Sequence, residues 1–230
     1  MASRRKLAAV VRPQLPQVVR RLTPDRIRHD PRLRALAVGS GLIPPRTMHT
    51  TGEAQLLTAL AGGRERVVEI GVYEGSSALV LLNALGPGAT LHLIDPFGHH
   101  PGALRAGWGA IEGATKRVVA RAAAGAGAPR VQWHVERSED TASRWAHEVD
   151  LVFIDGDHTE AGCRLDWDLW HPHVKPGGHI VFHDARSGPG SPPGLEGPIA
   201  VVDGLFRTDA TPDWELAEEV DRAVAVRRLR

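Results

Sequence analysis

Two segments of this sequence end in residues that could hold a metal ion or accept a proton. In DLVFIDGDH an apolar run is followed by Asp155, Asp157 and His158, and in GGHIVFHD a similar run is followed by His183 and Asp184. Carboxylates and imidazoles are ligands of divalent cations, and a histidine also accepts protons near neutral pH. Short apolar runs indicate buried strands, and the carboxyl ends of parallel strands meet at one edge of a sheet. We therefore expect these side chains to lie together at a ligand-binding edge.

A glycine-containing loop, VVEIGVYEGSS, stands earlier in the chain, between an expected strand and an expected helix. Gly71 and Gly75 allow a tight turn, and the N-terminus of the next helix offers free backbone N–H groups to an anion. Glu69 lies within the strand, where a buried carboxylate needs a cation or a hydrogen-bond donor. Asp95 ends the following strand, where Rossmann-like folds place the acid that binds ribose hydroxyls. Together these residues predict a nucleoside-bearing ligand with a charged amine.

Apolar runs and helix-like segments alternate from about residue 52 onward. The predicted parallel strands are 66–71, 90–95, 130–135, 150–155 and 178–184. The helices predicted around them are 53–61, 77–85, 103–125, 139–148 and 159–171. A Gly/Pro-rich loop, a helix and a hairpin follow, at 187–198, 199–206, 214–220 and 223–229. This order predicts an α/β fold: a doubly wound, mostly parallel seven-stranded sheet with an antiparallel C-terminal strand pair. The Gly/Pro-rich loop is expected to act as a lid.

The 230 residues suit one substantial domain with a basic extension. Residues 1–35 hold ten Lys or Arg against two Asp. We predict a basic N-terminal arm with short helices over 1–45 and a cofactor-binding domain over 46–230. Such an arm can bind nucleic acid or anionic lipid. The simpler interpretation is an arm that packs on its own acidic body or on a neighbouring subunit, so no nucleic-acid partner is expected.

The sequence carries no signal for export or membrane insertion. No apolar run approaches the roughly 20 residues of a membrane span, and the N-terminus lacks the apolar core of a signal peptide. The single cysteine, Cys163, excludes an internal disulfide. We expect a cytoplasmic protein with no membrane partner.

Several motifs resemble those of a known enzyme class. VEIGVYEGSSA is similar to the first motif of class I S-adenosylmethionine-dependent methyltransferases, in particular the metal-dependent catechol and caffeoyl-CoA O-methyltransferases. MHTTGEAQLL resembles the segment that covers the methionine end of the cofactor there. IDGDH and PGGHIVFHD resemble the macrocin-type sugar and antibiotic O-methyltransferases, and the resemblance covers about residues 45–228. It implies that S-adenosylmethionine is bound by Met48, Glu69, Gly71, Tyr73, Gly75, Ser77, Asp95 and Ser138.

The same resemblance implies a divalent metal, Mg²⁺ or Mn²⁺, held by Asp155, His183 and Asp184. The metal would chelate the hydroxyl of the acceptor and lower its pKa. His158, three residues after Asp155, matches the position of the general base in these families. The chain departs from the pattern at His183, where a carboxylate is usual. An imidazole there weakens the case for Mg²⁺ and favours Mn²⁺, Fe²⁺ or another metal that accepts nitrogen ligands.

Nearby acids have simpler explanations. Asp157 is equally well explained as the N-cap of the following helix. Asp166 and Asp168 lie on that helix, where we expect a solvated face with surface salt bridges.

The function predicted from these features is S-adenosylmethionine-dependent methylation of a hydroxyl on a small molecule, a sugar or a glycosylated natural product. The protein is expected to be a homo-oligomer. A nicotinamide-dependent oxidoreductase is the first alternative, although the loop lacks the G-x-G-x-x-G spacing. A non-catalytic cofactor-binding protein and a metal hydrolase built on the Asp/His residues are two further alternatives.

Overall fold

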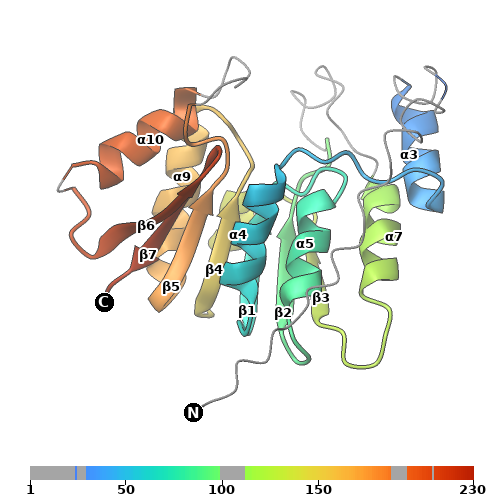
Figure 1. The fold of residues 1–230 in the computed structure, drawn as a ribbon, viewed down its shortest axis with the longest axis horizontal. Helices are drawn as coiled ribbons and strands as arrows, with labels where there is room; N and C mark the ends of the chain where they lie inside the picture. Colours follow the sequence, from blue (N-terminus) through green and yellow to red (C-terminus); the bar gives the residue numbers. More distant parts are fainter. Residues whose placement is uncertain (1–23, 25–29, 99–111, 188–195, 209) are drawn as a thin grey trace, which may run out of the picture.

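The structure is a computed structural model that describes residues 24, 30–98, 112–187, 196–208 and 210–230 (Figure 1). Most of the predicted basic arm, the first part of the helix predicted over 103–125, and most of the expected lid lie outside the described residues.

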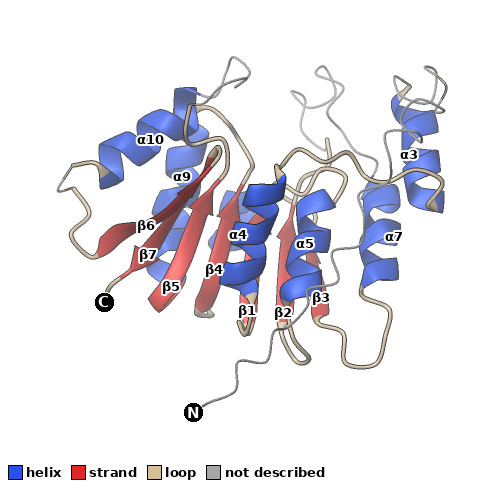
Figure 2. Ribbon diagram, in the orientation of Figure 1, coloured by secondary structure: helices blue, strands red, loops and turns tan. Residues whose placement is uncertain are grey.

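Seven strands form one mixed sheet in the order β3-β2-β1-β4-β5-β7-β6 (Figure 2). The strands are β1 Arg66–Ile70, β2 Thr90–Ile94, β3 Arg130–His134, β4 Val149–Ile154, β5 Val174–Phe182, β6 Trp214–Val220 and β7 Ala223–Arg228. Neighbours from β3 to β5 are parallel, whereas β7 runs antiparallel to both β5 and β6. The predicted fold class is thereby confirmed, including the antiparallel pair at the C-terminus.

Helices cover both faces of the sheet (Figure 1). The first face carries α4 Thr51–Ala61, α5 Ser76–Ala84 and α7 Glu112–Ala122, and the second carries α8 Ser138–Ala142, α9 Glu160–Trp170 and α10 Glu196–Phe206. A short 3₁₀ helix, η1 His171–His173, leads into β5. Because both faces are covered, the central strands β1 and β4 are buried along nearly their whole length, and their sequences are runs of Val, Ile, Leu and Phe.

Two element boundaries differ from the prediction for identifiable reasons. β5 begins at Val174, four residues early, and pairs with β4 through a register shift that accommodates the Pro-Gly-Gly segment. α8 ends at Ala142, and the chain then turns so that the Trp145 ring packs against His92 and Trp170. Among the described residues, no helix is both long and apolar enough to cross a lipid bilayer.

One N-terminal helix, α3 (Pro31–Ser40), docks on the domain predicted over 46–230. Asp30 caps α3 by accepting the backbone N–H groups of Arg32 and Leu33. Arg121 of α7 donates to the carbonyl oxygen of Gly39 at 2.6 Å, so α3 is fixed against α7. This part of the predicted arm is therefore built into the body of the protein.

The strand order places the two halves of the predicted site side by side. β1 lies between β2 and β4, and the chain leaves β1 toward β2 but returns later to β4 on the other side. Ligands bind at such a reversal, beyond the carboxyl ends of the strands. The glycine loop follows β1 and Asp155 follows β4, so both halves reach this point.

Candidate active site

The glycine loop presses directly against the end of β4. Gly71 has φ +86°, and a Cβ at this position would lie 2.1 Å from the carbonyl oxygen of Asp155. Gly75 also has φ +86° and is the N-cap residue of α5. Gly71 is thus required by its contact with the end of the neighbouring strand. This contact joins two halves of the site. The nucleoside half comprises the glycine loop, Glu69 and Asp95, and the Asp/His half comprises Asp155, His158, His183 and Asp184. The sequence suggested the loop but not this contact.

Asp95 organises the same loop from the end of β2. Its Oδ2 accepts the backbone N–H groups of Val72 and Tyr73, both at 2.8 Å, and its Oδ1 accepts that of Phe97 at 2.7 Å. Tyr73 and Phe97 have φ values of +52° and +45°, in the left-handed region that non-glycine residues seldom adopt. Hydrogen bonds from their own N–H groups to one carboxylate therefore hold two strained loop residues in place.

Glu69 is a buried acid within β1, fully covered by the surrounding protein. Its Oε1 accepts a short hydrogen bond from the Ser77 hydroxyl, and its Oε2 meets no hydrogen-bond donor among the described residues. Burial raises the pKa of Glu69 well above its usual value; the Ser77 hydrogen bond opposes this shift, and the charges of Asp155 and Asp95 add to it. An unpaired buried oxygen beside the glycine loop fits a ligand ammonium group.

Three other predicted cofactor residues, Tyr73, Met48 and Ser138, have partners within the protein. The Tyr73 hydroxyl accepts from Arg46 at 3.2 Å, and the Met48 carbonyl oxygen accepts from Arg222 at 3.1 Å. Ser138 is buried at the start of α8, and its hydroxyl accepts from the Trp170 indole N–H at 2.8 Å. The contact of Ser138 with adenine remains a prediction.

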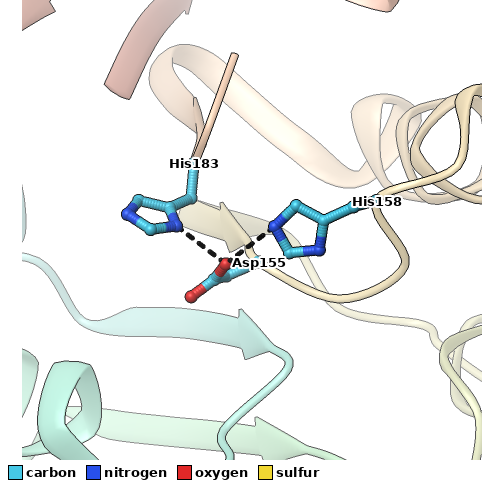
Figure 3. Close-up of side chains that lie close together, drawn as sticks. All are labelled: Asp155, His158 and His183. Carbon is cyan, nitrogen blue, oxygen red and sulfur yellow. Dashed lines mark hydrogen bonds and ion pairs between the residues drawn. The ribbon is translucent and has the colours of Figure 1, made fainter. Parts of the chain in front are cut away.

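The Asp/His half of the site brings together residues from the ends of β4 and β5 (Figure 3). His183 Nδ1 lies 2.8 Å from Asp155 Oδ1, and His158 Nε2 lies 3.6 Å from the same oxygen. Asp184 Oδ2 lies 3.3 Å from His158 Nε2 and 3.6 Å from His183 Nδ1. Four of the five residues expected at this edge of the sheet therefore lie in one cluster, and the fifth, Asp157, instead accepts the backbone N–H of Thr159.

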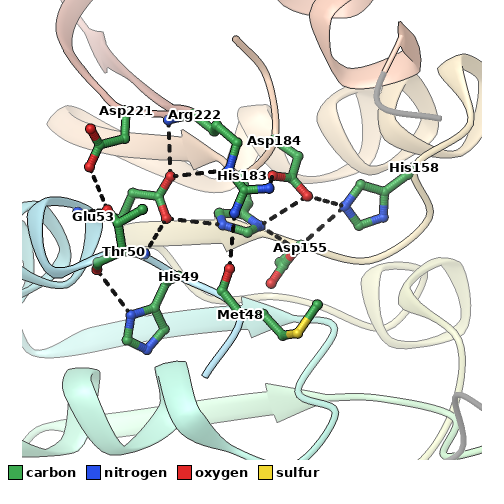
Figure 4. A network of polar contacts seen from close by, with 10 residues as sticks. All are labelled: Met48, His49, Thr50, Glu53, Asp155, His158, His183, Asp184, Asp221 and Arg222. Atoms are coloured by element: carbon green, nitrogen blue, oxygen red, sulfur yellow. Dashed lines mark hydrogen bonds and ion pairs between the residues drawn. The ribbon is translucent and has the colours of Figure 1, made fainter. Parts of the chain in front are cut away.

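Two residues that the sequence analysis did not assign to the site, Glu53 and Arg222, contact this cluster on the side of His183 and Asp184 (Figure 4). Glu53, whose side chain is 1% exposed, places Oε2 3.3 Å from His183 Nε2. Arg222, in the β6–β7 turn, pairs with Asp184 Oδ1 at 2.5 Å, and its backbone N–H donates to Glu53 Oε1 at 3.0 Å. A sequence signal existed for Glu53, since Thr50 and Glu53 form a capping box at the start of α4. That motif indicates a helix start and gives no hint of a site.

The charges in the cluster shift its pKa values in opposite directions. Burial would lower the pKa of His183, but the neighbouring Asp155 carboxylate and the hydrogen bonds to Asp155 and Glu53 prevail and raise it to about 10. The hydrogen bond to Asp184 raises the pKa of His158 against an opposing effect of burial. Burial would raise the pKa of Asp184, yet the hydrogen bond from His158 and the charges of His183 and Arg222 lower it. The acids thus create a position that favours positive charge.

Three neighbouring acids have structural roles. Asp157 accepts the N–H of Thr159 at 2.9 Å, and Thr159, not Asp157, caps α9. Asp168 forms the expected surface pair with Arg164. The expectation that Asp166 faces solvent is wrong: Asp166 is 5% exposed, and burial raises its pKa to about 6 although a hydrogen bond with Ser138 opposes the shift.

The donor set fits a divalent metal. Asp155, His158 and His183 each offer a ligand atom, and these atoms lie within 4.8 Å of one another. Carboxylate oxygen and imidazole nitrogen are ordinary ligands of divalent metals. The predicted ligand Asp184 lies next to this group, with Oδ2 3.3 Å from His158 and 3.6 Å from His183, and its other oxygen is paired with Arg222.

Solved structures of two O-methyltransferases share the fold of this chain. The O-methyltransferase TomG from Streptomyces achromogenes, solved with S-adenosylmethionine, aligns with a TM-score of 0.55 at 18% identity and covers 87% of this chain and 90% of that one. An O-methyltransferase from Bacillus cereus, solved with S-adenosylhomocysteine, aligns with a TM-score of 0.56 at 16% identity over 95% and 94% of the two chains. At such identities the similarity shows a shared methyltransferase fold.

Sequence comparison identifies the family. A family model described as a methyltransferase domain matches residues 68–185, about half of the chain. A protein of Mycolicibacterium smegmatis that is named as an O-methyltransferase is 30% identical over 176 residues, which cover 74% of this chain and 72% of that protein. A relative from Mycolicibacterium vanbaalenii is 30% identical over 166 residues, and the chain spans 62% of its length. The chain therefore belongs to the methyltransferase family.

Proposed function

We propose that this protein is an S-adenosylmethionine-dependent O-methyltransferase that methylates a hydroxyl group of a small molecule. The observation that carries the proposal is the contact between Gly71 and Asp155, which brings the nucleoside half of the site against the Asp/His half. A cofactor held by the first half would have the second half as its neighbour. Membership of the methyltransferase family supports the same activity.

The first half of the site would bind the cofactor. The unpaired Oε2 of Glu69 would accept a hydrogen bond from the ammonium of the methionine moiety, and Ser77 holds Glu69 in place from its other oxygen. Asp95, which already holds the glycine loop, would accept from the ribose hydroxyls. Met48 would lie near the methionine end, Tyr73 and Gly75 along the loop, and Ser138 near the adenine.

The second half would bind the acceptor and prepare its hydroxyl. Asp155, His183 and Asp184 would hold a divalent cation, which supplies a Lewis acid that lowers the pKa of a bound hydroxyl. Asp155 and His158 are the side chains proposed to meet the reacting hydroxyl. His158 could act as the proton acceptor or as a further ligand of the cation, and either role requires a lone pair on Nε2. The acceptor oxygen would then form its bond to the methyl carbon as the C–S bond breaks, and the hydroxyl proton would pass to His158, or to water where His158 binds the cation.

The acceptor class is proposed on weaker similarity. The resemblance of IDGDH and PGGHIVFHD to sugar and antibiotic O-methyltransferases supports a sugar or a glycosylated natural product. TomG, which shares the fold, is described as involved in tomaymycin synthesis. We further propose a homo-oligomer, because Leu33, Leu36 and Leu42 are exposed in and after α3.

Calorimetry followed by a product assay tests the proposed function. S-adenosylhomocysteine should bind with one site per chain, whereas a nicotinamide dinucleotide should give no heat of binding. Mass spectrometry should then detect a single added methyl group on at least one member of a panel of sugars, glycosides and catechols. Binding of the nicotinamide cofactor alone would overturn the proposal in favour of an oxidoreductase.

A further inference from the structure

The His183 ring is oriented by a buried carboxylate. Its Nε2 lies 3.3 Å from Oε2 of Glu53, which is itself fixed by the backbone N–H groups of Thr50 at 2.8 Å and Arg222 at 3.0 Å. An ionised carboxylate only accepts hydrogen bonds, so Nε2 of His183 carries a proton. Nδ1 lies 2.8 Å from Asp155 Oδ1, which is also an acceptor, so in the doubly protonated ring Nδ1 donates to Asp155, and a cation bound between them would replace that proton.

A main-chain carbonyl group sets the tautomer of His158. Its Nδ1 lies 3.2 Å from the carbonyl oxygen of Gly156, which also only accepts. Nδ1 of His158 therefore carries the proton in the neutral ring, and Nε2 presents its lone pair toward Asp155 and Asp184.

Four potential ligand atoms thus lie close together: Asp155 Oδ1, His158 Nε2, His183 Nδ1 and Asp184 Oδ2. Asp155 and Asp184 each lie 2.8–3.6 Å from the two histidine nitrogens, and ligand atoms of Asp155, His158 and His183 all lie within 4.8 Å of one another. Ligands placed 2.0–2.2 Å from one metal ion lie about 3.3–3.6 Å apart in a tetrahedral site and about 2.8–3.1 Å apart at neighbouring octahedral positions. A metal-bound histidine commonly donates its second N–H to a carboxylate or a carbonyl oxygen, as both rings do here.

We propose that these residues form a two-histidine, two-carboxylate centre that binds a first-row transition metal in preference to Mg²⁺, with His158 as a ligand and Glu53 as the residue that positions His183. The proposal rests on the proposed function for the use of the centre, and it assigns His158 to the metal instead of to proton transfer. Two imidazoles suit Zn²⁺, Co²⁺ or Fe²⁺, whereas Mg²⁺ prefers oxygen ligands throughout.

The exposure of the four side chains leaves one side of the centre open. His183 and Asp184 are 3% and 11% exposed, whereas Asp155 and His158 are 19% and 34% exposed. Arg222 pairs with Asp184 Oδ1 and so leaves Oδ2 directed at the centre. A catalytic metal site keeps a coordination position for water or substrate, and the exposed side offers it.

Titration of the chelator-stripped full chain with Co²⁺ tests this proposal, because Co²⁺ bound to nitrogen and oxygen ligands absorbs visible light. The wild type should bind one Co²⁺ with a ligand-field band that Zn²⁺ displaces and a large excess of Mg²⁺ does not. Loss of the ligand in His158→Ala should weaken Co²⁺ binding at least about tenfold and change the band. Glu53→Gln should weaken it by about 10–100-fold, the range for a residue that orients a ligand. His147→Ala, at an exposed histidine outside the cluster, should leave both unchanged.

Each contrary result overturns a defined part of the proposal. A His158→Ala variant with wild-type Co²⁺ affinity and spectrum would remove His158 from the centre. A wild type that binds neither Co²⁺ nor Zn²⁺ would overturn the centre and favour protonated histidines paired directly with the acids. If Glu53→Gln fails to fold, His158→Ala still decides, since it alters a partly exposed loop residue. Calorimetry with S-adenosylhomocysteine on the same preparations tests the proposed function separately.

Discussion

Replacement of Asp95 by Asn tests whether one carboxylate organises the cofactor loop. Asp95 accepts three backbone hydrogen bonds, from Val72, Tyr73 and Phe97, at 2.7–2.8 Å. Asn has a single acceptor oxygen, so its NH₂ group must face at least one of these N–H donors. A hydrogen bond to a charged group contributes about 1.5–3 kcal/mol. One lost bond and the lost charge on the others should reduce the free energy of unfolding by about 2–4 kcal/mol.

The affinity for the cofactor should fall as well, because the loop loses its fixed conformation and the ribose loses an ionised acceptor. A loss of about 1.4 kcal/mol corresponds to a tenfold weaker Kd, and we expect at least this effect. Urea unfolding monitored by circular dichroism gives the stability, and calorimetry with S-adenosylhomocysteine gives the Kd. Asp157→Asn is the matched control, since Asp157 is exposed and accepts one backbone N–H at 2.9 Å. That variant should lie within about 0.5 kcal/mol of the wild type.

The result that would refute the reasoning is an Asp95→Asn variant as stable as the Asp157→Asn control. If stability falls but the Kd for S-adenosylhomocysteine does not change, Asp95 shapes the loop without binding the ribose.

Three further predictions concern packing and charge around the site. Burial raises the pKa of the Asp166 carboxyl from 3.8 to about 6, so the folded state binds the carboxyl proton more tightly than the unfolded state does. The free energy of unfolding should therefore fall as the pH rises from about 4 to 6. Asp166→Asn should remove this loss of stability, which is at most about 3 kcal/mol above pH 6. If the free energy of urea unfolding depends on pH in the same way in the variant and the wild type, the raised pKa of Asp166 is contradicted. Glu74→Gln removes the charge that pairs with Arg34 at 2.6 Å, and should raise hydrogen exchange in α3 while amides of the distant β6 stay protected; unchanged exchange in α3 would show that the pair is dispensable. Gly71→Ala adds a Cβ that would lie 2.1 Å from the Asp155 carbonyl oxygen at a φ of +86°, and should cost about 3 kcal/mol or more in unfolding experiments; a wild-type Tm would contradict the contact.

The order of elements was predictable because each strand and helix is specified locally. The buried strands consist mostly of Val, Ile, Leu and Phe, and helices such as α4 and α9 have their own N-caps. The β6–β7 hairpin followed from two apolar segments separated by Asp221 and Arg222. The predicted boundaries were wrong where tertiary contacts determine the end of an element. At β5, pairing with β4 extends the strand back across the Pro-Gly-Gly segment.

The sequence by itself determined which residue types reach the carboxyl ends of the central strands, and so placed Glu69, Asp95, Asp155 and His183 at one edge of the sheet. It could not assign their partners, because hydrogen bonds between side chains depend on segments that meet only after folding. Glu53 and His183 are separated by 130 positions in the chain, yet they touch because α4 packs beside the end of β5. The tertiary structure alone thus decided which ring nitrogen of His183 faces Asp155, since that choice depends on where a distant buried carboxylate lies.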